Sequence, residues 1–252
     1  KRIVLVGARA PIGFFAYPSK PAILTAEGTD IINLCTTAQD IGGALAALRD
    51  GADGASTAPA HVAKSATPDK PSGPLEPAGI AAALGRTIPE NAIVVDAAIT
   101  TGRNFYPATA GAPKHSWLNN CGGSIGYGLP VAVGAAVACP DRKVMALMGD
   151  GSAMYTVQSL WTMAREQLDI TVLIFANRSY KILRGELTNV GVQNPGPRAI
   201  DMLSLDRPAL GWVGLSESMG VAGERVDSAG DLARAIRNGL AQSGPYLIEV
   251  AM

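Results

Sequence analysis

The sequence has few of the residues that build disulfide frameworks and zinc sites. Its 252 residues include three cysteines and two histidines. Cys35, Cys121 and Cys139 stand too far apart in the sequence to form a CxxC pair. This spacing argues against a disulfide scaffold and against a zinc site. The low cysteine usage favours a reducing compartment, and we expect a cytoplasmic protein.

An excess of charge and a long apolar run are also missing. Lys and Arg (21) balance Asp and Glu (21), so the formal net charge is zero. The basic residues are scattered, which argues against a nucleic-acid surface. The most apolar long stretch, IGYGLPVAVGAAVACP at 125–140, is interrupted by Gly and Pro and is too short for a membrane span. The first residues also lack the pattern of a signal peptide. We therefore expect neither nucleic acid nor a membrane as a partner.

What the sequence does contain is apolar residues, at 48%, and enough length for one large domain with part of another. RIVLVG at 2–7 predicts a buried strand, and AQDIGGALAALRD at 38–50 predicts a helix. Residues 51–74 are rich in Ala, Ser, Pro and Gly, a composition typical of linkers. We predict the end of one domain over 1–50, a linker over 51–74 and a main domain over 75–252.

Strand and helix patterns alternate along the main domain. The predicted elements are, in chain order, a helix at 76–88, a strand at 92–97, a helix at 126–139, a strand at 143–149, a helix at 152–167, a strand at 170–177, helices at 206–220 and 229–242, and a strand at 246–252. Short, continuously apolar strands separated by helices favour a parallel sheet covered on both faces. We predict an α/β fold with a doubly wound, mostly parallel sheet. Such sheets bind ligands beyond the carboxyl ends of their strands.

Two oxygen-bearing side chains follow neighbouring predicted strands. Asp150 comes after the strand at 143–149, and Asn177 ends the strand at 170–177. A helix of about fifteen residues, roughly 22 Å long, and a strand of about the same length would bring both to one edge. Carboxylate and amide oxygens suit Mg2+ or Ca2+. The alternative is that Asp150 only caps a helix and Asn177 only forms a turn.

Two glycines flank this acid in MGDGSAMYTV. Gly149 and Gly151 would let the backbone approach a ligand closely, and the free N–H groups of the following helix would face an anion. The pattern therefore predicts a site that combines a metal ion with a diphosphate.

The stretch at 149–180, GDGSAMYTVQSLWTMAREQLDITVLIFANRSY, resembles the thiamine-diphosphate motif of the 2-oxo acid decarboxylase and acetolactate synthase superfamily. The similarity extends over the chain and is greatest to acetolactate-synthase-like large subunits. It implies that Mg2+ is held by Asp150, Asn177 and the main-chain carbonyl of Ser179. Ala176 stands where the first asparagine of the family's pair usually stands. The implied cofactor-binding residues are Gly123, Ser124, Ile125, Gly149, Gly151, Ser152, Tyr180 and Leu183.

The stretch at 122–152, which begins GGSIGYGLP, is similar to the segment that lies against the cofactor in acetolactate synthases and benzoylformate decarboxylases. The resemblance implies that Ile125 wedges between the two cofactor rings and that the carbonyl of Gly123 accepts a hydrogen bond from the aminopyrimidine. A bent cofactor brings its exocyclic amine beside the thiazolium carbon, whose proton it can take. The alternative places Ile125 in the first turn of a buried helix.

Several other polar or small residues stand near these motifs. By the resemblance, Ala97 stands where relatives often carry an acid, and Thr100 is a candidate for a diphosphate contact. We expect His115 to be a surface-loop residue and Cys121 a small packed residue. Arg184 and Glu186 are interpreted as a solvated face rather than as substrate contacts.

The resemblance implies a thiamine-diphosphate- and Mg2+-dependent enzyme that decarboxylates a small 2-oxo acid, with possible carboligation of the acetolactate type used in branched-chain amino acid biosynthesis. One alternative is a simple decarboxylase of the benzoylformate type. Another is a non-catalytic or regulatory homologue, which is favoured by the alanines at 97 and 176, where relatives carry polar residues. A NAD-binding Rossmann protein is a less favoured alternative, because no GxGxxG follows the first strand of the main domain.

The family's first domain supplies the activating glutamate, so no catalytic residue is assigned within this chain. We expect that domain before Lys1, in a protein about twice as long whose central Rossmann-like domain ends at 1–50. Because active sites of the family lie between subunits, the resemblance also implies a homodimer or homotetramer.

Overall fold

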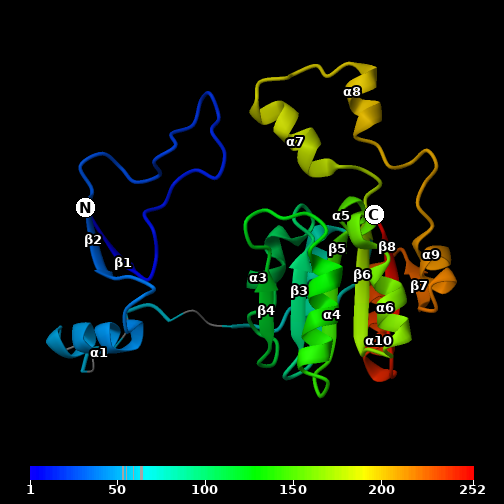
Figure 1. Cartoon of the computed structure of the whole chain (residues 1–252), viewed down its shortest axis with the longest axis horizontal. Coiled ribbons are helices and arrows are strands. Elements are labelled where there is room, and N and C mark those ends of the chain that lie inside the picture. The colour runs from blue at the N-terminus through cyan, green and yellow to red at the C-terminus, as the bar shows by residue number, and fades with distance from the viewer. Residues whose placement is uncertain (53, 55, 59, 63–64) are drawn as a thin grey trace. The chain divides into compact units, whose positions relative to one another are not determined.

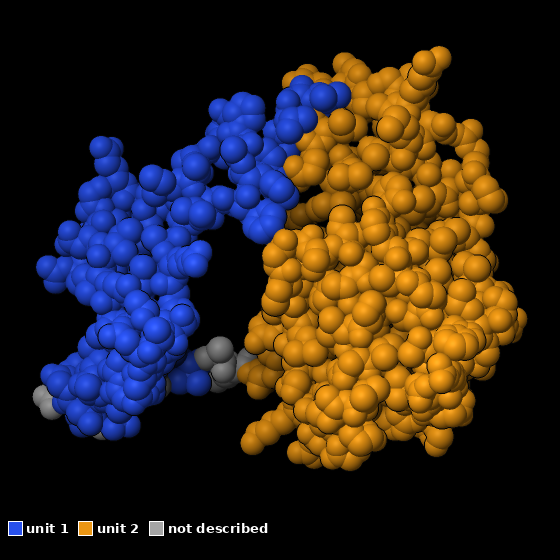
Figure 2. Space-filling view, in the orientation of Figure 1, with its two compact units in different colours: residues 1–64, 189–192 blue, residues 65–188, 193–252 orange. Residues whose placement is uncertain are grey.

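The computed structural model describes residues 1–52, 54, 56–58, 60–62 and 65–252. The chain forms two compact units, which Figure 2 colours separately: residues 1–64 with 189–192, and residues 65–188 with 193–252. The predicted linker at 51–74 falls partly outside the described residues, at 53, 55, 59, 63 and 64. The predicted domain boundaries remain predictions.

The first unit contains two parallel strands and one helix. These elements are β1 (Arg2–Val6), β2 (Asp30–Cys35) and α1 (Ile41–Gly51). The predicted strand and helix are present, but the prediction that the strand is buried is wrong, because every residue of β1 is exposed or only partly buried. β2 was not predicted because its apolar run is short and begins with an acid. The helix begins at residue 41 because Asp40 caps it, accepting a hydrogen bond from the N–H of Gly43 at 2.9 Å.

In the second unit six strands form one sheet in the order β4-β3-β5-β6-β8-β7, and every neighbouring pair is parallel. The strands are β3 (Ile93–Ala97), β4 (Ser116–Asn119), β5 (Val144–Gly149), β6 (Ile170–Ala176), β7 (Ala222–Val226) and β8 (Tyr246–Ala251). The predicted parallel α/β sheet is confirmed. The two edge strands, β4 and β7, were not predicted because they are short, partly exposed and contain polar residues.

Helices cover both faces of this sheet, and two hydrophobic cores result. Along β6, Leu173 and Phe175 enter one core while Val172 and Ile174 enter the other, as strand alternation requires. The helices of the first core are α2 (Pro77–Thr87), α3 (Phe105–Ala108) and α10 (Ala229–Ala241). Those of the second are α4 (Gly128–Ala138), α6 (Ser159–Arg165) and α9 (Trp212–Ser218). Figure 1 shows α4 and α6 on the near face of the sheet. Each large side chain fully buried in these cores contributes about 1.5–3 kcal/mol.

The predicted helix at 152–167 is wrong in its start and in its continuity. The segment forms α5 (Asp150–Ala153), a 3-10 turn η2 (Met154–Thr156) and then α6. Side-chain contacts of this segment with the loop before α4, described below, hold the turn in place, and such tertiary contacts override helical periodicity.

The predicted helix at 206–220 is also shorter, since α9 begins only at Trp212. Four further short elements are not among the predicted elements given above: η1 (Gly102–Asn104), α3, α7 (Lys181–Asn189) and α8 (Pro197–Met202). None of the helices in the described ranges is long and apolar enough to cross a membrane.

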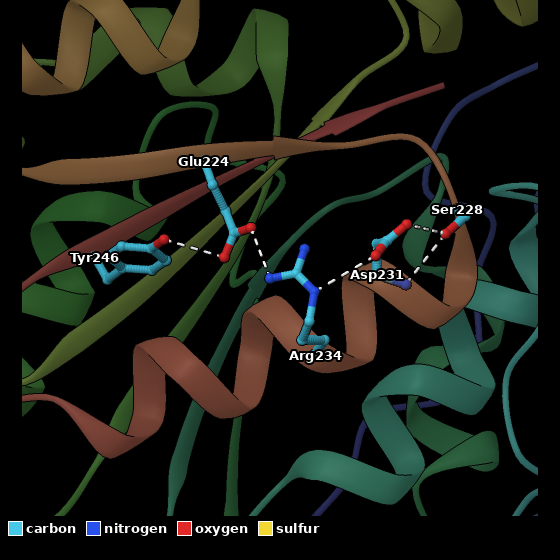
Figure 3. Close-up of polar contacts among 5 residues, drawn as sticks. All are labelled: Glu224, Ser228, Asp231, Arg234 and Tyr246. Atoms are coloured by element: carbon cyan, nitrogen blue, oxygen red, sulfur yellow. Dashed lines mark hydrogen bonds and ion pairs between the residues drawn. The ribbon is translucent and has the colours of Figure 1, made fainter.

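A polar network fastens α10 to the edge of the sheet (Figure 3). Arg234 of α10 donates to Glu224 of β7 at 3.0 Å and to Asp231 at 3.4 Å. The hydroxyl of Tyr246 on β8 donates to the other oxygen of Glu224 at 3.1 Å. Ser228 caps the helix by accepting from the N–H of Asp231 at 3.1 Å. This network lies on the surface of β7, β8 and α10 and orients the helix.

Candidate functional site

A cavity of about 250 Å3 lies at the carboxyl ends of three central strands, β3, β5 and β6. Its walls come from the segment after β3, the segment after β5, the segment after β6 and one residue of the loop before α4. The lining residues are Ala97, Ala98, Ile99, Thr100, Thr101, Ile125, Gly149, Asp150, Gly151, Ser152, Tyr155, Asn177, Ser179, Tyr180, Lys181, Ile182 and Leu183. The cavity is therefore at the edge of the sheet where the sequence predicted a ligand.

Asp150 joins the ends of β5 and β6. The side chain is buried, with 3% of the residue exposed. One carboxylate oxygen accepts from the N–H of Gly151 at 2.8 Å, and the other accepts from the N–H of Arg178 at 2.7 Å. Burial raises the pKa of Asp150, although these amide donors act in the opposite direction. A carboxylate offers about four acceptor positions, so both oxygens can still bind a cation.

Asn177 and Ser179 lie in the same cavity wall as Asp150. The side-chain oxygen of Asn177 accepts from the N–H of Ser179 at 3.0 Å. Between them Arg178 has a φ of 53°, and this left-handed turn directs its N–H to Asp150. The Ser179 hydroxyl donates to the carbonyl of Leu203 at 3.1 Å, which anchors the turn.

The donor chemistry of this wall fits a hard divalent cation. Asp150 offers a carboxylate, Asn177 an amide oxygen, and Ser179 a main-chain carbonyl, a set that suits Mg2+ or Ca2+ and not Zn2+. Within the described part of the chain, no three or more His, Cys, Asp and Glu side chains gather as a metal cluster. The structure thus brings together the three predicted metal ligands, whose binding of a metal remains a proposal.

The glycines beside Asp150 leave room in two different ways. A Cβ on Gly149, which lines the cavity, would meet no atom within 4 Å, so a side chain there would project into open space. A Cβ on Gly151 would lie 2.7 Å from Cε1 of Tyr180, since the Tyr180 ring packs directly over that glycine. Gly149 therefore leaves space open in the cavity, and Gly151 lets the segment after β5 pack against Tyr180, just before α7.

The loop that carries Ile125 is attached to the segment after β5. The N–H of Gly126 donates to the Ser152 hydroxyl at 3.1 Å, and the Thr156 hydroxyl donates to the Gly126 carbonyl at 2.7 Å. Gly126 has a φ of 79° and a Cβ there would lie 2.5 Å from Cβ of Tyr155, so only glycine fits this position. Two hydrogen bonds and the close packing of Tyr155 thus fix the loop beside the cavity.

Ile125 itself lines the cavity and is 55% exposed. It precedes the first residue of α4, Gly128, so the alternative that placed it in a buried first turn is wrong. Its position suits the predicted wedge between cofactor rings. Leu183, the other predicted apolar contact, is also in the wall, at the start of α7.

Two predicted cofactor residues are not part of the cavity wall. Gly123 and Ser124 lie in the exposed loop before Ile125. There the carbonyl of Ser124 accepts from the Asn120 amide at 2.8 Å, and its hydroxyl donates to the Cys121 carbonyl at 3.2 Å. These contacts shape the loop, and a cofactor contact of either residue remains a prediction.

Several wall residues were missed by sequence reasoning. Tyr155, Lys181 and Ile182 were not singled out, although the last two stand between the predicted residues Tyr180 and Leu183. That adjacency was the available signal. No such signal marked Tyr155, because the continuous helix expected at 152–167 gave no reason for its side chain to face the cavity.

The segment after β3 forms the remaining wall. Ala97 is buried, with 2% of the residue exposed, and Thr100 lines the cavity. Below them, one Asp96 carboxylate oxygen accepts from the N–H of Ala98 at 3.0 Å, and the Tyr127 hydroxyl donates to the Asp96 carbonyl. Burial raises the pKa of Asp96, and burial together with the Asp96 charge raises the pKa of Tyr127 to about 12.

Three other residues lie outside the wall. His115 precedes β4, at the amino edge of the sheet, with its Nδ1 2.7 Å from the Pro113 carbonyl. The prediction that Cys121 is packed is wrong, because it is exposed in the glycine-rich loop after β4. Arg184 is half-buried and donates to the Ser204 hydroxyl at 2.8 Å, so the interpretation as a solvated residue is wrong for it.

Comparison with known proteins gives a consistent result. Residues 99–250 match the family described as thiamine pyrophosphate enzyme, C-terminal TPP binding domain. The whole chain is 46% identical to the protein provisionally named acetolactate synthase large subunit IlvX of Mycobacterium tuberculosis and covers 48% of it. Over 71% of the chain the identity to benzoylformate decarboxylase of Pseudomonas aeruginosa is 31%, covering 32% of that protein.

A solved structure resembles the chain as well. The thiamine diphosphate-dependent 4-hydroxybenzoylformate decarboxylase of Rhodococcus jostii RHA1 is similar over the whole chain with a TM-score of 0.77 and 27% identity. The chain covers 48% of that structure. It thus spans about half the length of the relatives that it matches from end to end.

Proposed function

Because this chain belongs to the thiamine pyrophosphate enzymes through their C-terminal TPP-binding domain, we propose that its cavity binds thiamine diphosphate together with Mg2+. We further propose that the protein of which it forms a part decarboxylates a small 2-oxo acid. The observation that supports this most directly is the meeting of Asp150, Asn177 and Ser179 in one cavity wall, beside the open space at Gly149.

The metal and the diphosphate would share the polar end of the cavity. Asp150, Asn177 and the Ser179 carbonyl would hold Mg2+ through oxygen atoms alone. The Ser152 hydroxyl already accepts a hydrogen bond from Gly126, so its own proton is free to be donated to a phosphate oxygen. Gly149, with no side chain, leaves space for the phosphates.

When bound, thiamine diphosphate would supply a nucleophilic carbon for the 2-oxo group and a cationic thiazolium ring that serves as the electron sink for loss of CO2. The apolar walls of this chain have a separate role. Ile99, Ile125, Ile182 and Leu183 line the cavity and would exclude water from the reacting groups. Ile125 is held by the fixed loop at Gly126 and would keep the cofactor rings bent. Leu183 would face the substrate.

The fate of the decarboxylated product separates two candidate reactions. The identity of 46% to the IlvX protein favours carboligation of the acetolactate type, which would place the protein in branched-chain amino acid biosynthesis. The similarity to benzoylformate decarboxylase favours release of an aldehyde instead. Supplying pyruvate or benzoylformate with thiamine diphosphate and Mg2+, then measuring CO2, acetolactate and aldehyde, distinguishes the two.

This turnover assay, combined with a binding measurement, tests the proposal as a whole. Calorimetric titration should show Mg2+-dependent binding of thiamine diphosphate, and the turnover assay should show CO2 release. Binding without turnover of any 2-oxo acid would instead support the non-catalytic or regulatory homologue. Absence of any binding would overturn the assignment of the cavity.

Two further parts of the proposal concern what lies outside these 252 residues. The activating glutamate would come from another domain, which the family resemblance implies. A homodimer or homotetramer would join that domain of one subunit to the cavity of another. Sedimentation equilibrium of the protein that contains this chain measures the assembly state, and a monomer with full activity would contradict this part.

A further inference from the structure

Lys181 contributes a positive charge to the cavity wall. Of the lining residues, only Asp150 and Lys181 carry charged side chains, and most others are apolar. Asp150 accepts backbone hydrogen bonds on both oxygens. Lys181 has no ion-pair partner among the described residues. Lys181 is exposed at this wall, and an ammonium group that lines a cavity without an ion-pair partner can bind an anion on a ligand.

Lys181 lies at the polar end of the cavity. It is the first residue of α7 and directly follows Tyr180, whose ring packs over Gly151. It comes two residues after Ser179, in the proposed metal wall. The diphosphate of the proposed function would occupy this end, while Ile99, Ile125 and Leu183 line the apolar remainder.

The start of α7 supplies further donors in the same place. The N–H groups of Leu183 and Arg184 both donate to the Tyr180 carbonyl. Within the described chain, the N–H groups of Lys181 and Ile182 meet no acceptor, as is usual for the first residues of a helix. Free N–H groups and the positive end of a helix dipole favour an anion. Backbone donors and the Lys181 ammonium group would therefore act on one group.

We propose that Lys181 binds the diphosphate of the cofactor and supplies positive charge in addition to that of the divalent ion. This inference rests on the proposed function and adds to it a residue that the sequence motif did not indicate. A diphosphate carries more negative charge than one divalent ion neutralises, so an ammonium group beside it is favourable. The contact would also compensate for Ala97 and Ala98, which offer the diphosphate no polar side chain.

The test compares Lys181→Met with Lys181→Arg and with Lys114→Met. Methionine keeps most of the side-chain length and removes the charge, whereas arginine keeps the charge. Lys114 is an exposed lysine before β4, outside the cavity wall, so its variant carries the same charge change elsewhere. Circular dichroism confirms that each variant is folded. Isothermal titration calorimetry measures the affinity for thiamine diphosphate and for inorganic diphosphate, both with Mg2+.

We expect Lys181→Met to weaken binding of both ligands by the same factor, about tenfold. Lys181→Arg should retain most of the affinity, and Lys114→Met all of it. Added salt should weaken thiamine diphosphate binding less steeply in Lys181→Met than in the unsubstituted chain, because one screened attraction is gone.

Three results would overturn the inference. Unchanged affinity of Lys181→Met for both ligands, with a raised KM for the 2-oxo acid, would assign Lys181 to the substrate carboxylate. Weaker binding of thiamine diphosphate with unchanged binding of inorganic diphosphate would assign it to the cofactor rings. If the unsubstituted chain binds neither ligand, the proposed function itself fails, and this outcome is recognised before any variant is compared.

Discussion

The N–H of Gly126 donates a hydrogen bond to the hydroxyl of Ser152 at 3.1 Å. This contact joins the loop that carries Ile125 to the segment that carries Asp150, although the two glycine-rich motifs are far apart in the sequence. Ile125 and the polar end of the cavity around Asp150 are therefore held in one fixed arrangement. A cofactor with bent rings and a diphosphate needs both parts at a set distance.

The first prediction concerns this connection. Thr156→Val removes the hydroxyl that donates to the Gly126 carbonyl at 2.7 Å and should cost about 1 kcal/mol of folding stability. Because Thr156 is not in the cavity wall, affinity for thiamine diphosphate should fall less than in Ser152→Ala, which also loses a phosphate donor. Urea denaturation and calorimetry measure the two effects. Equal loss of affinity in both variants would show that Ser152 only fixes the loop.

The second prediction concerns Asp150. Replacing it by alanine removes the only carboxylate of the proposed metal set and should lower the Mg2+-dependent affinity for thiamine diphosphate by at least about 100-fold. The sheet and its cores do not depend on this side chain, so circular dichroism should remain unchanged. Asp141→Ala, at an exposed acid before β5, is the matched control and should bind normally. Full cofactor affinity in Asp150→Ala would refute the metal assignment.

The third prediction separates cofactor space from backbone stability. Gly149 has a φ of −74°, which any residue adopts, so Gly149→Ala should leave stability unchanged or raise it by about 0.4–1 kcal/mol. Its new Cβ would project into the open space by the diphosphate and should lower cofactor affinity about tenfold or more. Thermal melting and calorimetry should thus show opposite effects.

Gly134→Ala provides the control for this change. Gly134 lies on the exposed side of α4, and a Cβ there also meets no atom within 4 Å. The control should gain about 0.5–1 kcal/mol of stability and bind the cofactor as before. Unaltered cofactor affinity in Gly149→Ala would mean that the diphosphate lies elsewhere.

The fourth prediction concerns the apolar wedge. Because Ile125 is 55% exposed, Ile125→Ala should change stability by less than about 1 kcal/mol. Without the wedge the cofactor rings are less constrained, and kcat of the active protein should fall by about tenfold or more. Ile125→Met should restore most of kcat, since it has a similar volume. Val137→Ala, at a valine that is 62% exposed on α4, should retain the activity. Normal kcat in Ile125→Ala would count against the wedge.

The fifth prediction concerns the opposite edge of the sheet and depends on pH. Asp169, just before β6, accepts from Lys143 at 2.6 Å and from the N–H of Gly244 at 2.7 Å. Burial acts to raise the pKa of Asp169, but Lys143 and the Gly244 amide outweigh it and lower that pKa. The folded state therefore favours the charged form. The resulting stability is present above the unfolded pKa of about 3.9 and is lost as the pH falls through the lower folded value.

Asp169→Asn should accordingly lower the free energy of unfolding by about 0.5–1 kcal/mol at pH 7. The stability difference from the unsubstituted protein should shrink below about pH 4. Chemical denaturation across this pH range measures it. Cofactor affinity should not change, because Asp169 lies at the amino ends of the strands, away from the cavity. A stability difference that grows at low pH would contradict the proposed ion pair.

The strand, helix and strand between Asp150 and Asn177 show how far sequence reasoning reached. The length of the elements was enough to bring both residues to one edge, since parallel strands end at the same side of the sheet. The course of the chain between them was not predicted correctly. Its helix is broken at Met154–Thr156 because Thr156 and Ser152 bond to Gly126, a contact between distant segments that periodicity does not encode.

The sequence by itself determined the parallel α/β sheet and the edge at which ligands collect, because these depend on apolar periodicity and local spacing. The family was indicated by the resemblance of the motifs at 122–152 and 149–180. Tertiary structure alone decided that Lys181 lines the cavity, that Cys121 is exposed and that Ile125 stands free of α4. It also decided the pairing of the short edge strands β4 and β7. The physical reason is that side-chain exposure and contacts between loops depend on which distant segments pack together, and each such contact is too weak to leave a local pattern in the sequence.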